Sequence, residues 1–239
     1  MYRILLAALI AFTVVSCGKE NDNMTVKGTV EGLRKGTIYF QKIADSSLVT
    51  LDSVVINGQP DFNFSTHVES PEVFTLYLDK NDGNLLNDRL DFFGEAGTIT
   101  INTSRDYFAP EAQVKGSKSH DTWMEYKKIA TKFSEKNLEL LKETLEASKD
   151  GKIELADSLQ KVSNNNSKRS YLYTLNFIFN NSTSYAAPYI TLTEAYNTNL
   201  KYLDSINNSL SEEVADSKYG KLLSDYIERV REASKDTLP

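Results

Sequence analysis

The stretch that decides the fold is AQVKGSKSHDTWMEYKKIATKF, residues 112–133, because the spacing of its apolar residues changes part of the way along it. Before Gly116, apolar and polar residues alternate, which is the period of a β-strand with one buried face. After Gly116, the residues Tyr126, Ile129 and Phe133 recur every three or four positions, which is the period of an amphipathic helix. The sequence therefore predicts a β domain before this point and a helical domain after it.

Eight short runs rich in β-branched and aromatic residues make up the β domain, which we assign to residues 25–116. The runs are TVKGTV (25–30), GTIYFQKI (36–43), LVTLDSVVI (48–56), DFNFSTHV (61–68), VFTLYLD (73–79), RLDFFG (89–94), GTITIN (97–102) and AQVKG (112–116). Eight strands at this spacing predict an antiparallel β-sandwich or barrel rather than βαβ units. Asn57-Gly58 predicts a hairpin turn between two of them, because both residues accept a positive φ.

The helical domain is assigned to residues 117–239, where apolar residues recur at helical spacing. Such sets include Leu138, Leu141 and Leu145; Leu155, Leu159 and Val162; Leu172, Leu175 and Phe179; and Tyr219, Leu222, Leu223, Tyr226, Ile227 and Val230. Asp150-Gly151 is expected to separate the first two helices, Asn180-Asn181-Ser182 to end the second, and Pro188 to lie in the first turn of the third. The predicted fold class is α+β: an antiparallel β-sandwich of about eight strands followed by four or five helices.

The N-terminus MYRILLAALIAFTVVS, residues 1–16, has the features of a secretory signal peptide. Its apolar run of about twelve residues is too short to span a bilayer as a helix, which needs about twenty. Ser16 directly before Cys17 resembles a bacterial lipobox, in which the cysteine is acylated and becomes the new N-terminus. We therefore predict a lipoprotein in which Cys17 carries palmitate-like acyl chains, and in which residues 17–24 form a flexible tether.

Composition excludes several classes of function. The chain has 239 residues, with 27 lysines and arginines against 33 aspartates and glutamates, and a single cysteine. An acidic balance provides no basic face for nucleic acid, so none is expected as a partner. If Cys17 is acylated, no thiol is left for a disulfide, a nucleophile or a metal site.

Candidate residues for chemistry are few, and we predict no catalytic, cofactor-binding or metal-binding residues. His67 and His120 are the only histidines, and neither belongs to a metal-ligand motif such as H-E-x-x-H; we expect His67 to be half-buried and His120 to be solvated. Residues 79–91 are rich in carboxylates and amides, but Gly83 is one position too early for a calcium loop. Paired carboxylates, as in a glycoside hydrolase, stay open as an alternative.

Tyrosine is abundant, with 13 in the chain and nine of them from Tyr126 onward. Tyrosines on a surface can stack on sugars or on a protein partner, but Tyr171, Tyr185, Tyr219 and Tyr226 are expected to pack where the helices meet. Asp followed by Ser or Thr and an aliphatic residue, as at Asp52-Ser53-Val54, also resembles an O-glycosylation signal of bacterial envelope proteins. Three similar triplets begin at Asp157, Asp204 and Asp236.

Residues 25–128 resemble domain of unknown function 4369, an N-terminal accessory domain of envelope lipoproteins. The matching segments are VKGTVEGLRKGTIYF, LDSVVINGQPDFNF, DFFGEAGTITI and VKGSKSHDTWMEYKK, and the individual marks are Asp52-Ser53, Asn57-Gly58, Glu95 with Gly97, and Gly116-Ser117. Gln59-Pro60 departs from the family's pattern. The segments NNSTSYAAPYI (180–190) and SKYGKLLSDYIERV (217–230) also resemble the connector found in these proteins.

In most proteins of this kind a thioredoxin-like domain with Cys-x-x-Cys follows, similar to alkyl hydroperoxide reductases and thiol-specific antioxidants. This chain has no such motif, so the resemblance implies the accessory half alone and transfers no catalytic residue. We expect a non-catalytic, lipid-anchored cell-envelope protein, at the outer membrane and facing either the periplasm or the surface, which binds an envelope protein or a glycan. The alternative is a helper subunit for a separate thioredoxin-like thiol:disulfide oxidoreductase.

Overall fold

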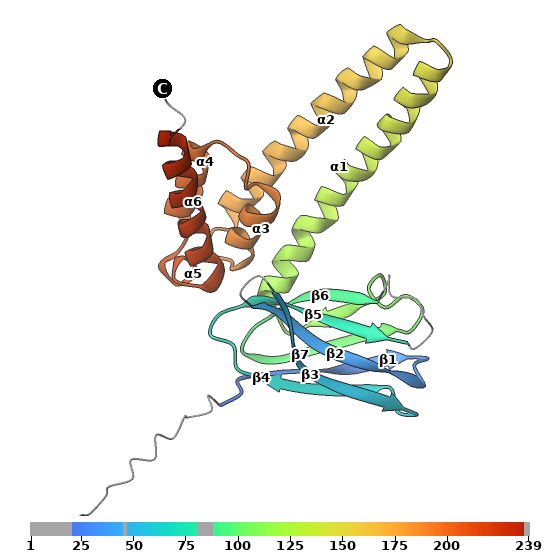
Figure 1. Cartoon of the computed structure of the whole chain (residues 1–239), viewed down its shortest axis with the longest axis vertical. Coiled ribbons are helices and arrows are strands. Elements are labelled where there is room, and N and C mark those ends of the chain that lie inside the picture. Colours follow the sequence, from blue (N-terminus) through green and yellow to red (C-terminus); the bar gives the residue numbers. More distant parts are fainter. Residues whose placement is uncertain (1–20, 45–46, 81–87, 237–239) are drawn as a thin grey trace, which may run out of the picture.

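The computed structural model describes residues 21–44, 47–80 and 88–236. Eight strands come first: β1 (Met24–Glu31), β2 (Lys35–Ala44), β3 (Ser47–Asn57), β4 (Asp61–Thr66), β5 (Glu72–Asp79), β6 (Arg89–Gly94), β7 (Gly97–Ser104) and β8 (Gln113–Lys115). Six helices follow: α1 (Lys118–Lys149), α2 (Ile153–Asn180), α3 (Ala186–Glu194), α4 (Leu200–Ser209), α5 (Glu212–Ala215) and α6 (Lys218–Asp236). Figure 1 shows the strands in one body and the helices beyond one side of it, which confirms the α+β class.

The strands form two four-stranded sheets, with the orders β4-β1-β7-β8 (sheet A) and β3-β2-β5-β6 (sheet B). Every pair within sheet B is antiparallel, but β1 and β7 of sheet A pair in parallel, with Met24 opposite Gly97 and Glu31 opposite Ser104. The predicted antiparallel sandwich is confirmed, and the parallel contact of β1 with β7 is a feature that the sequence did not predict. Periodicity identifies strands but does not say which strands become neighbours.

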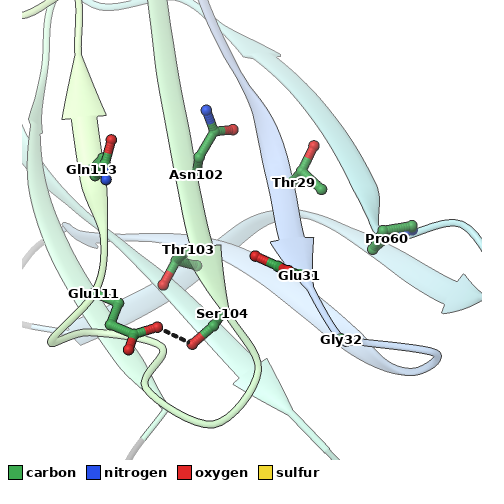
Figure 2. A pocket seen from close by; sticks show the side chains of 9 residues that line it. All are labelled: Thr29, Glu31, Gly32, Pro60, Asn102, Thr103, Ser104, Glu111 and Gln113. Atoms are coloured by element: carbon green, nitrogen blue, oxygen red, sulfur yellow. Dashed lines mark hydrogen bonds between the residues drawn. The ribbon is translucent and has the colours of Figure 1, made fainter.

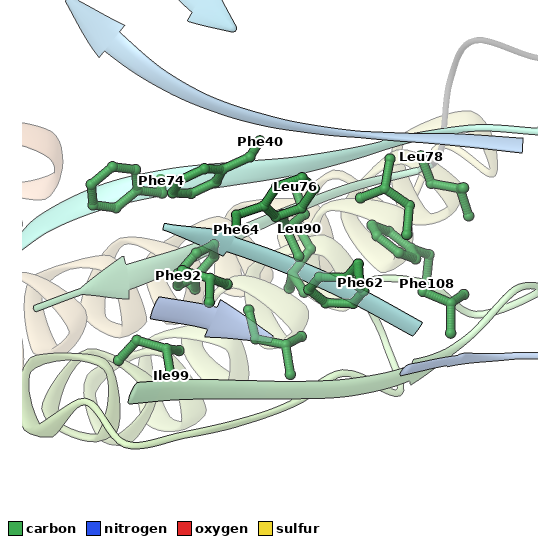
Figure 3. Packing of buried hydrophobic residues seen from close by; sticks show 14 of the residues in the cluster. Phe40, Phe62, Phe64, Phe74, Leu76, Leu78, Leu90, Phe92, Ile99 and Phe108 are labelled. Carbon is green, nitrogen blue, oxygen red and sulfur yellow. The ribbon is translucent and has the colours of Figure 1, made fainter. Parts of the chain in front are cut away.

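The core of the sandwich lies between the two sheets and is rich in phenylalanine (Figure 3). Phe40 stacks on Phe64 of the opposite sheet at 5.4 Å and on Phe74 of the neighbouring strand at 5.1 Å between ring centroids. The residues that the alternation assigned to inner faces are buried, among them Phe62, Phe64, Phe74, Leu76, Leu78, Ile99 and Ile101. Stacked rings at these separations add attraction to the burial of apolar area.

The Asn57-Gly58 turn does not form the predicted hairpin. Gly58 has a φ of +104°, as a turn of this composition requires, but β3 belongs to sheet B and β4 to sheet A. The N–H of Gly58 donates to the carbonyl of Arg34 at 2.9 Å, so the turn folds beside the loop that joins the first two strands. The chain here crosses from one sheet to the other, a path that turn chemistry alone does not specify.

The first two helices form a long antiparallel hairpin, which projects away from the sandwich and from the shorter helices (Figure 1). The predicted breaks at Asp150-Gly151 and at Asn180-Asn181-Ser182 are confirmed. Polar groups fix the pairing of the two helices: the Asn166 Nδ2 donates to the Asn137 Oδ1 at 2.8 Å, and the Asn137 Nδ2 donates to the Ser167 Oγ at 3.1 Å. A register slip would break these hydrogen bonds and exchange them for bonds to water.

Helices α3 to α6 pack around the base of the hairpin and share one apolar core with it. Phe93 of β6 belongs to this second core rather than to the sandwich core, and its ring lies 5.7 Å from Trp123, 5.3 Å from Tyr189 and 6.0 Å from Tyr219. The backbone N–H of Val73 donates to the Tyr219 hydroxyl at 3.0 Å. The helical part is therefore docked on one end of sheet B. None of the helices in the described ranges is long and apolar enough to cross a membrane.

A carboxylate of the sandwich caps the start of α1 and fixes the junction. Glu95 accepts from the backbone N–H of Lys118 at 2.8 Å and from the hydroxyls of Ser117 and Ser119 at 3.1 and 2.8 Å. A carboxylate at a helix N-terminus accepts hydrogen bonds from the free N–H groups, and its negative charge is attracted to the positive end of the helix dipole. Gly116 precedes the cap with a φ of +100°, and a Cβ there would lie 2.2 Å from the carbonyl oxygen of Thr98.

Candidate binding site

An open, polar hollow lies where β1, β7 and β8 of sheet A approach the loop after β7 (Figure 2). Its volume is about 640 Å³, which is within the usual range for small-molecule sites. Nearly all of its lining side chains are polar. They are Thr29, Glu31, Asn102, Thr103, Ser104, Glu111 and Gln113, together with Gly32 and Pro60.

Strand alternation places five of these side chains on the outer face of sheet A, namely Thr29, Glu31, Asn102, Ser104 and Gln113, whereas Thr103 is buried and Glu111 lies in the loop after β7. In β7, Ile99 and Ile101 point into the core, so Asn102 between Ile101 and Thr103 points outward. Register brings neighbours together across three strands, since Thr29 lies opposite Asn102 and Asn102 lies opposite Gln113. The sequence therefore builds a row of short hydrogen-bonding side chains along this edge of the pocket.

Hydrogen bonds hold part of this lining and leave part of it available. The Ser104 Oγ donates to the Glu111 Oε2 at 2.6 Å, as Figure 2 shows, and the Thr103 hydroxyl donates to the carbonyl of Phe108 at 2.6 Å. By contrast, the side chains of Asn102 and Gln113 make no hydrogen bond to any other described residue. These two amides can both donate to and accept from a ligand.

The charge of the lining limits what the pocket can bind. Glu31 and Glu111 are exposed carboxylates, and no lysine or arginine among the described residues lines the hollow. Phosphates and other anions are therefore disfavoured there. Carboxylates and amides side by side match the vicinal hydroxyls of a sugar, since each can take part in two hydrogen bonds at once.

A second and larger hollow, of about 1030 Å³, lies at the junction between the sandwich and α6. The buried carboxylate of Glu72 in this hollow forms ion pairs with the Lys42 Nζ, at 3.1 Å, and with Lys218, so it is not available to a ligand. The Lys218 ammonium further donates to the carbonyl of Ile43 at 3.2 Å. These groups hold the helices against the sandwich, so we place the candidate site in the polar pocket of sheet A.

The two histidines lie in different environments, and neither reaches the polar pocket. His67 follows the end of β4, is half-buried as predicted, and its Nδ1 lies 3.1 Å from the carbonyl of Asn21. His120 lies in the first turn of α1 and is buried, so the expectation of a solvated side chain was wrong. Within residues 21–44, 47–80 and 88–236, no group of three or more His, Cys, Asp or Glu side chains is arranged to hold a metal ion.

Burial explains the state of His120. Removal from water lowers its pKa from 6.5 to about 4; the nearby charge of Asp121 opposes this shift and that of Lys127 adds to it. The neutral ring accepts at Nδ1 from the backbone N–H of Phe93, at 3.4 Å, and lies edge-on to Trp123. His120 is therefore part of the junction between helices and sandwich.

The four tyrosines expected at helix contacts lie there. The hydroxyl of Tyr226 donates to the carbonyl of Tyr196 at 2.7 Å, and that of Tyr185 donates to the Glu213 Oε1 at 2.6 Å. Tyr171 is hydrogen-bonded to Thr198. Tyr219, as described above, reaches the backbone of β5. These side chains join elements rather than form a stacking surface.

Several residues singled out in the sequence lie outside the described residues, namely Cys17, most of the 79–91 segment and Thr237. Of the other glycosylation-like positions, Ser53, Ser158 and Ser205 are exposed. The polar pocket itself was missed by the motif search. Its signal in the sequence was the polar residues that alternate with apolar ones in β1, β7 and β8. Any sheet face exposed to water shows the same alternation, so this signal does not identify a pocket.

The geometry defines the protein as a two-sheet β-sandwich that carries a docked helical domain and a polar pocket on one sheet. Residues 24–123 match the model of a family described as a domain of unknown function, DUF4369. The match covers the sandwich and the start of α1. No curated protein matches the chain. The family marks Glu95 and Ser117 are direct partners in the structure, across the junction.

Proposed function

We propose that this protein is a non-catalytic, lipid-anchored protein of the bacterial cell envelope, held at the outer membrane, and that its sandwich binds a glycan. The observation that carries the binding role is the polar pocket of sheet A, where the amides of Asn102 and Gln113 and the carboxylate of Glu31 face the hollow. The family is one of unknown function, so the argument depends on the chemistry of these side chains.

The lining supports binding rather than reaction. Ser104 donates to Glu111 and lies near no histidine, so it lacks the base and orienting acid that an activated nucleophile requires. A binding pocket for sugars needs groups that match hydroxyls, which the amides of Asn102 and Gln113 and the carboxylate of Glu31 provide. We therefore name a neutral or amino saccharide as the ligand class.

The ligand prediction is tested by substituting both amides. We expect the full chain to bind an oligosaccharide such as chitotriose weakly, and Asn102→Ala with Gln113→Ala to lower the affinity about tenfold or more, since each lost hydrogen bond contributes about 1 kcal/mol. Isothermal titration calorimetry measures this. Asn63→Ala, an exposed amide of β4 that lies outside the lining, is the matched control and should leave binding unchanged. Equal binding by the double variant, or no binding of neutral or amino sugars by the parent chain, would refute the proposal.

The lipid anchor is tested separately at Cys17. When the wild-type chain is expressed in bacterial cells that process lipoproteins, it should incorporate labelled palmitate and sediment with the membranes. Cys17→Ser should lose the label and move to the soluble fraction, because the acyl chains provide the membrane affinity. Ser16→Ala keeps a small residue before the cysteine and should behave as the wild type. An exported protein whose mass corresponds to an unmodified thiol would contradict the anchor.

The alternative function in the cell envelope is that of a helper subunit for a separate thioredoxin-like enzyme. It predicts that deleting the protein changes the disulfide state of other envelope proteins, whereas a glycan-binding role does not. Comparison of the oxidised thiols of envelope proteins with and without this chain separates the two.

A further inference from the structure

An apolar stripe on α1 is left uncovered by the described part of the chain. Leu138, Leu141 and Leu145 of α1 are 67, 51 and 61 % exposed, although their spacing is that of a helix face meant for burial. They lie on the hairpin that projects from the body (Figure 1). Single exposed leucines are ordinary, but three at positions i, i+3 and i+7 form a continuous seam.

The seam is distinct from the contact between the two helices of the hairpin. Leu140 and Ala147 are the buried residues in this part of α1, where it faces α2. At about 100° of rotation per residue, the three leucines fall on a flank roughly 130° away from that contact. A second helix is able to approach this flank without disturbing the hairpin.

We propose that the leucine seam, Leu138, Leu141 and Leu145, pairs with the same seam of a second copy of this chain, so that two hairpins form an antiparallel four-helix bundle. A symmetric contact of this kind is isologous, which requires the surface to complement itself. Antiparallel pairing that sets Leu138 of one copy against Leu141 of the other is centred between these residues and meets that requirement; Leu145 of each copy then lies beside Ser134 of the other, at the two ends of the contact.

Charge on the edge of the seam supports the second copy as the occupant. Glu135 and Lys142 are both exposed and lie on the side of the seam farther from α2. The same antiparallel register brings Glu135 of one copy to within about 3 Å, measured along the helix axis, of the level of Lys142 of the other, at two symmetric positions, which long side chains can span. Within one chain the two residues are seven positions apart, about 10 Å along the axis, too far for an ion pair.

An anionic membrane surface fits the seam less well. Glu135, Glu139 and Glu146 lie on the same side of α1 as Lys142, so the charge beside the leucines is mixed and mostly negative. Membrane-bound amphipathic helices instead carry lysine and arginine along that boundary. Three leucines also bury much less than the about 800 Å² per partner of a standard interface, so the dimer is weak and is favoured where the chain is locally concentrated.

The experiment is sedimentation velocity of the full chain over a range of concentrations. We expect reversible dimers, with a dissociation constant raised about tenfold or more by Leu141→Gln. Leu172→Gln is the matched control, because Leu172 is a similarly exposed leucine of α2 and should leave the dimer unchanged. Circular dichroism of each variant verifies that the helices are retained.

A charge swap decides whether the contact is between copies. Glu135→Lys alone and Lys142→Glu alone each place like charges opposite one another and should weaken the dimer, whereas the double variant restores opposite charges and should recover it. Recovery cannot arise within one chain, because the two residues do not meet there. A chain that stays monomeric at all concentrations, or a dimer insensitive to both Leu141→Gln and the charge swap, would overturn the proposal. Neither result bears on the polar pocket.

Discussion

Replacing Phe93 by alanine is expected to lower the free energy of unfolding by about 3–5 kcal/mol, the usual cost of removing a buried phenylalanine ring. Phe93 is fully buried, yet it points away from the sandwich core and into a cluster with Trp123, Tyr189 and Tyr219. The substitution therefore leaves a cavity between the helical part and sheet B. We expect docking of the helices to weaken before either core unfolds.

Trp123 reports this directly, because it is the only tryptophan in the chain. Urea unfolding followed by tryptophan fluorescence and by circular dichroism should give separate transitions for Phe93→Ala, with the fluorescence change first. Phe92→Ala is the matched control, since the neighbouring residue of β6 faces the sandwich core and stacks on Phe74 at 6.0 Å. It should destabilise to a similar degree without altering the fluorescence of the folded state. Identical curves for the two variants would contradict the assignment of Phe93 to the junction.

Acidification is expected to destabilise the same junction through His120. The pKa of His120 is about 4 in the folded chain against an ordinary 6.5, so the unfolded chain binds the proton first as the pH falls. The free energy of unfolding is therefore independent of His120 above about pH 6.5. It falls between pH 6.5 and pH 4, by about 1.4 kcal/mol per pH unit, and the total loss is about 3 kcal/mol.

His120→Gln isolates this contribution. Glutamine stays neutral at every pH, and its side-chain oxygen can accept from the Phe93 N–H in place of the imidazole nitrogen. Urea unfolding at pH 7, 5.5 and 4 should show a shallower loss of stability in the variant than in the wild type. Carboxylates titrate over the lower part of this range in both proteins. The contribution of His120 is therefore the difference between the free energies of unfolding of the wild type and the variant at each pH. Parallel curves would show that His120 does not couple folding to pH.

Local pattern was sufficient to predict the elements of this fold. All eight strands lie where alternation and turn residues placed them, and the helix breaks at Asp150-Gly151 and Asn180-Asn181-Ser182 are where turn-forming residues interrupt the apolar period. The sequence also predicted which side chains face the core, because a period of two assigns each side chain of a strand to one face of the sheet. Four or five helices were expected and six are present, the difference being the four-residue α5.

Partners distant in sequence could not be predicted in the same way. Asn57-Gly58 has the composition of a hairpin turn, but whether the next strand pairs with the last depends on the arrangement of both sheets. His120 appeared to be a surface residue because nothing near it in sequence shows that Phe93 and Trp123 will cover it. The polar pocket depends on register between β1, β7 and β8, which a single sequence does not supply.

The parallel pairing of β1 with β7 has a consequence for the order of folding. These strands are separated by more than sixty residues, whereas β2 with β3 and β5 with β6 are near neighbours along the chain. Contacts between distant segments form late, because closing a long loop costs entropy before any contact is gained. Sheet B can therefore assemble while the chain is still emerging, and β1 can pair with β4 on one side, but its other edge stays unpaired until β7 arrives. During that interval the first strand is the segment of the sandwich most open to mispairing.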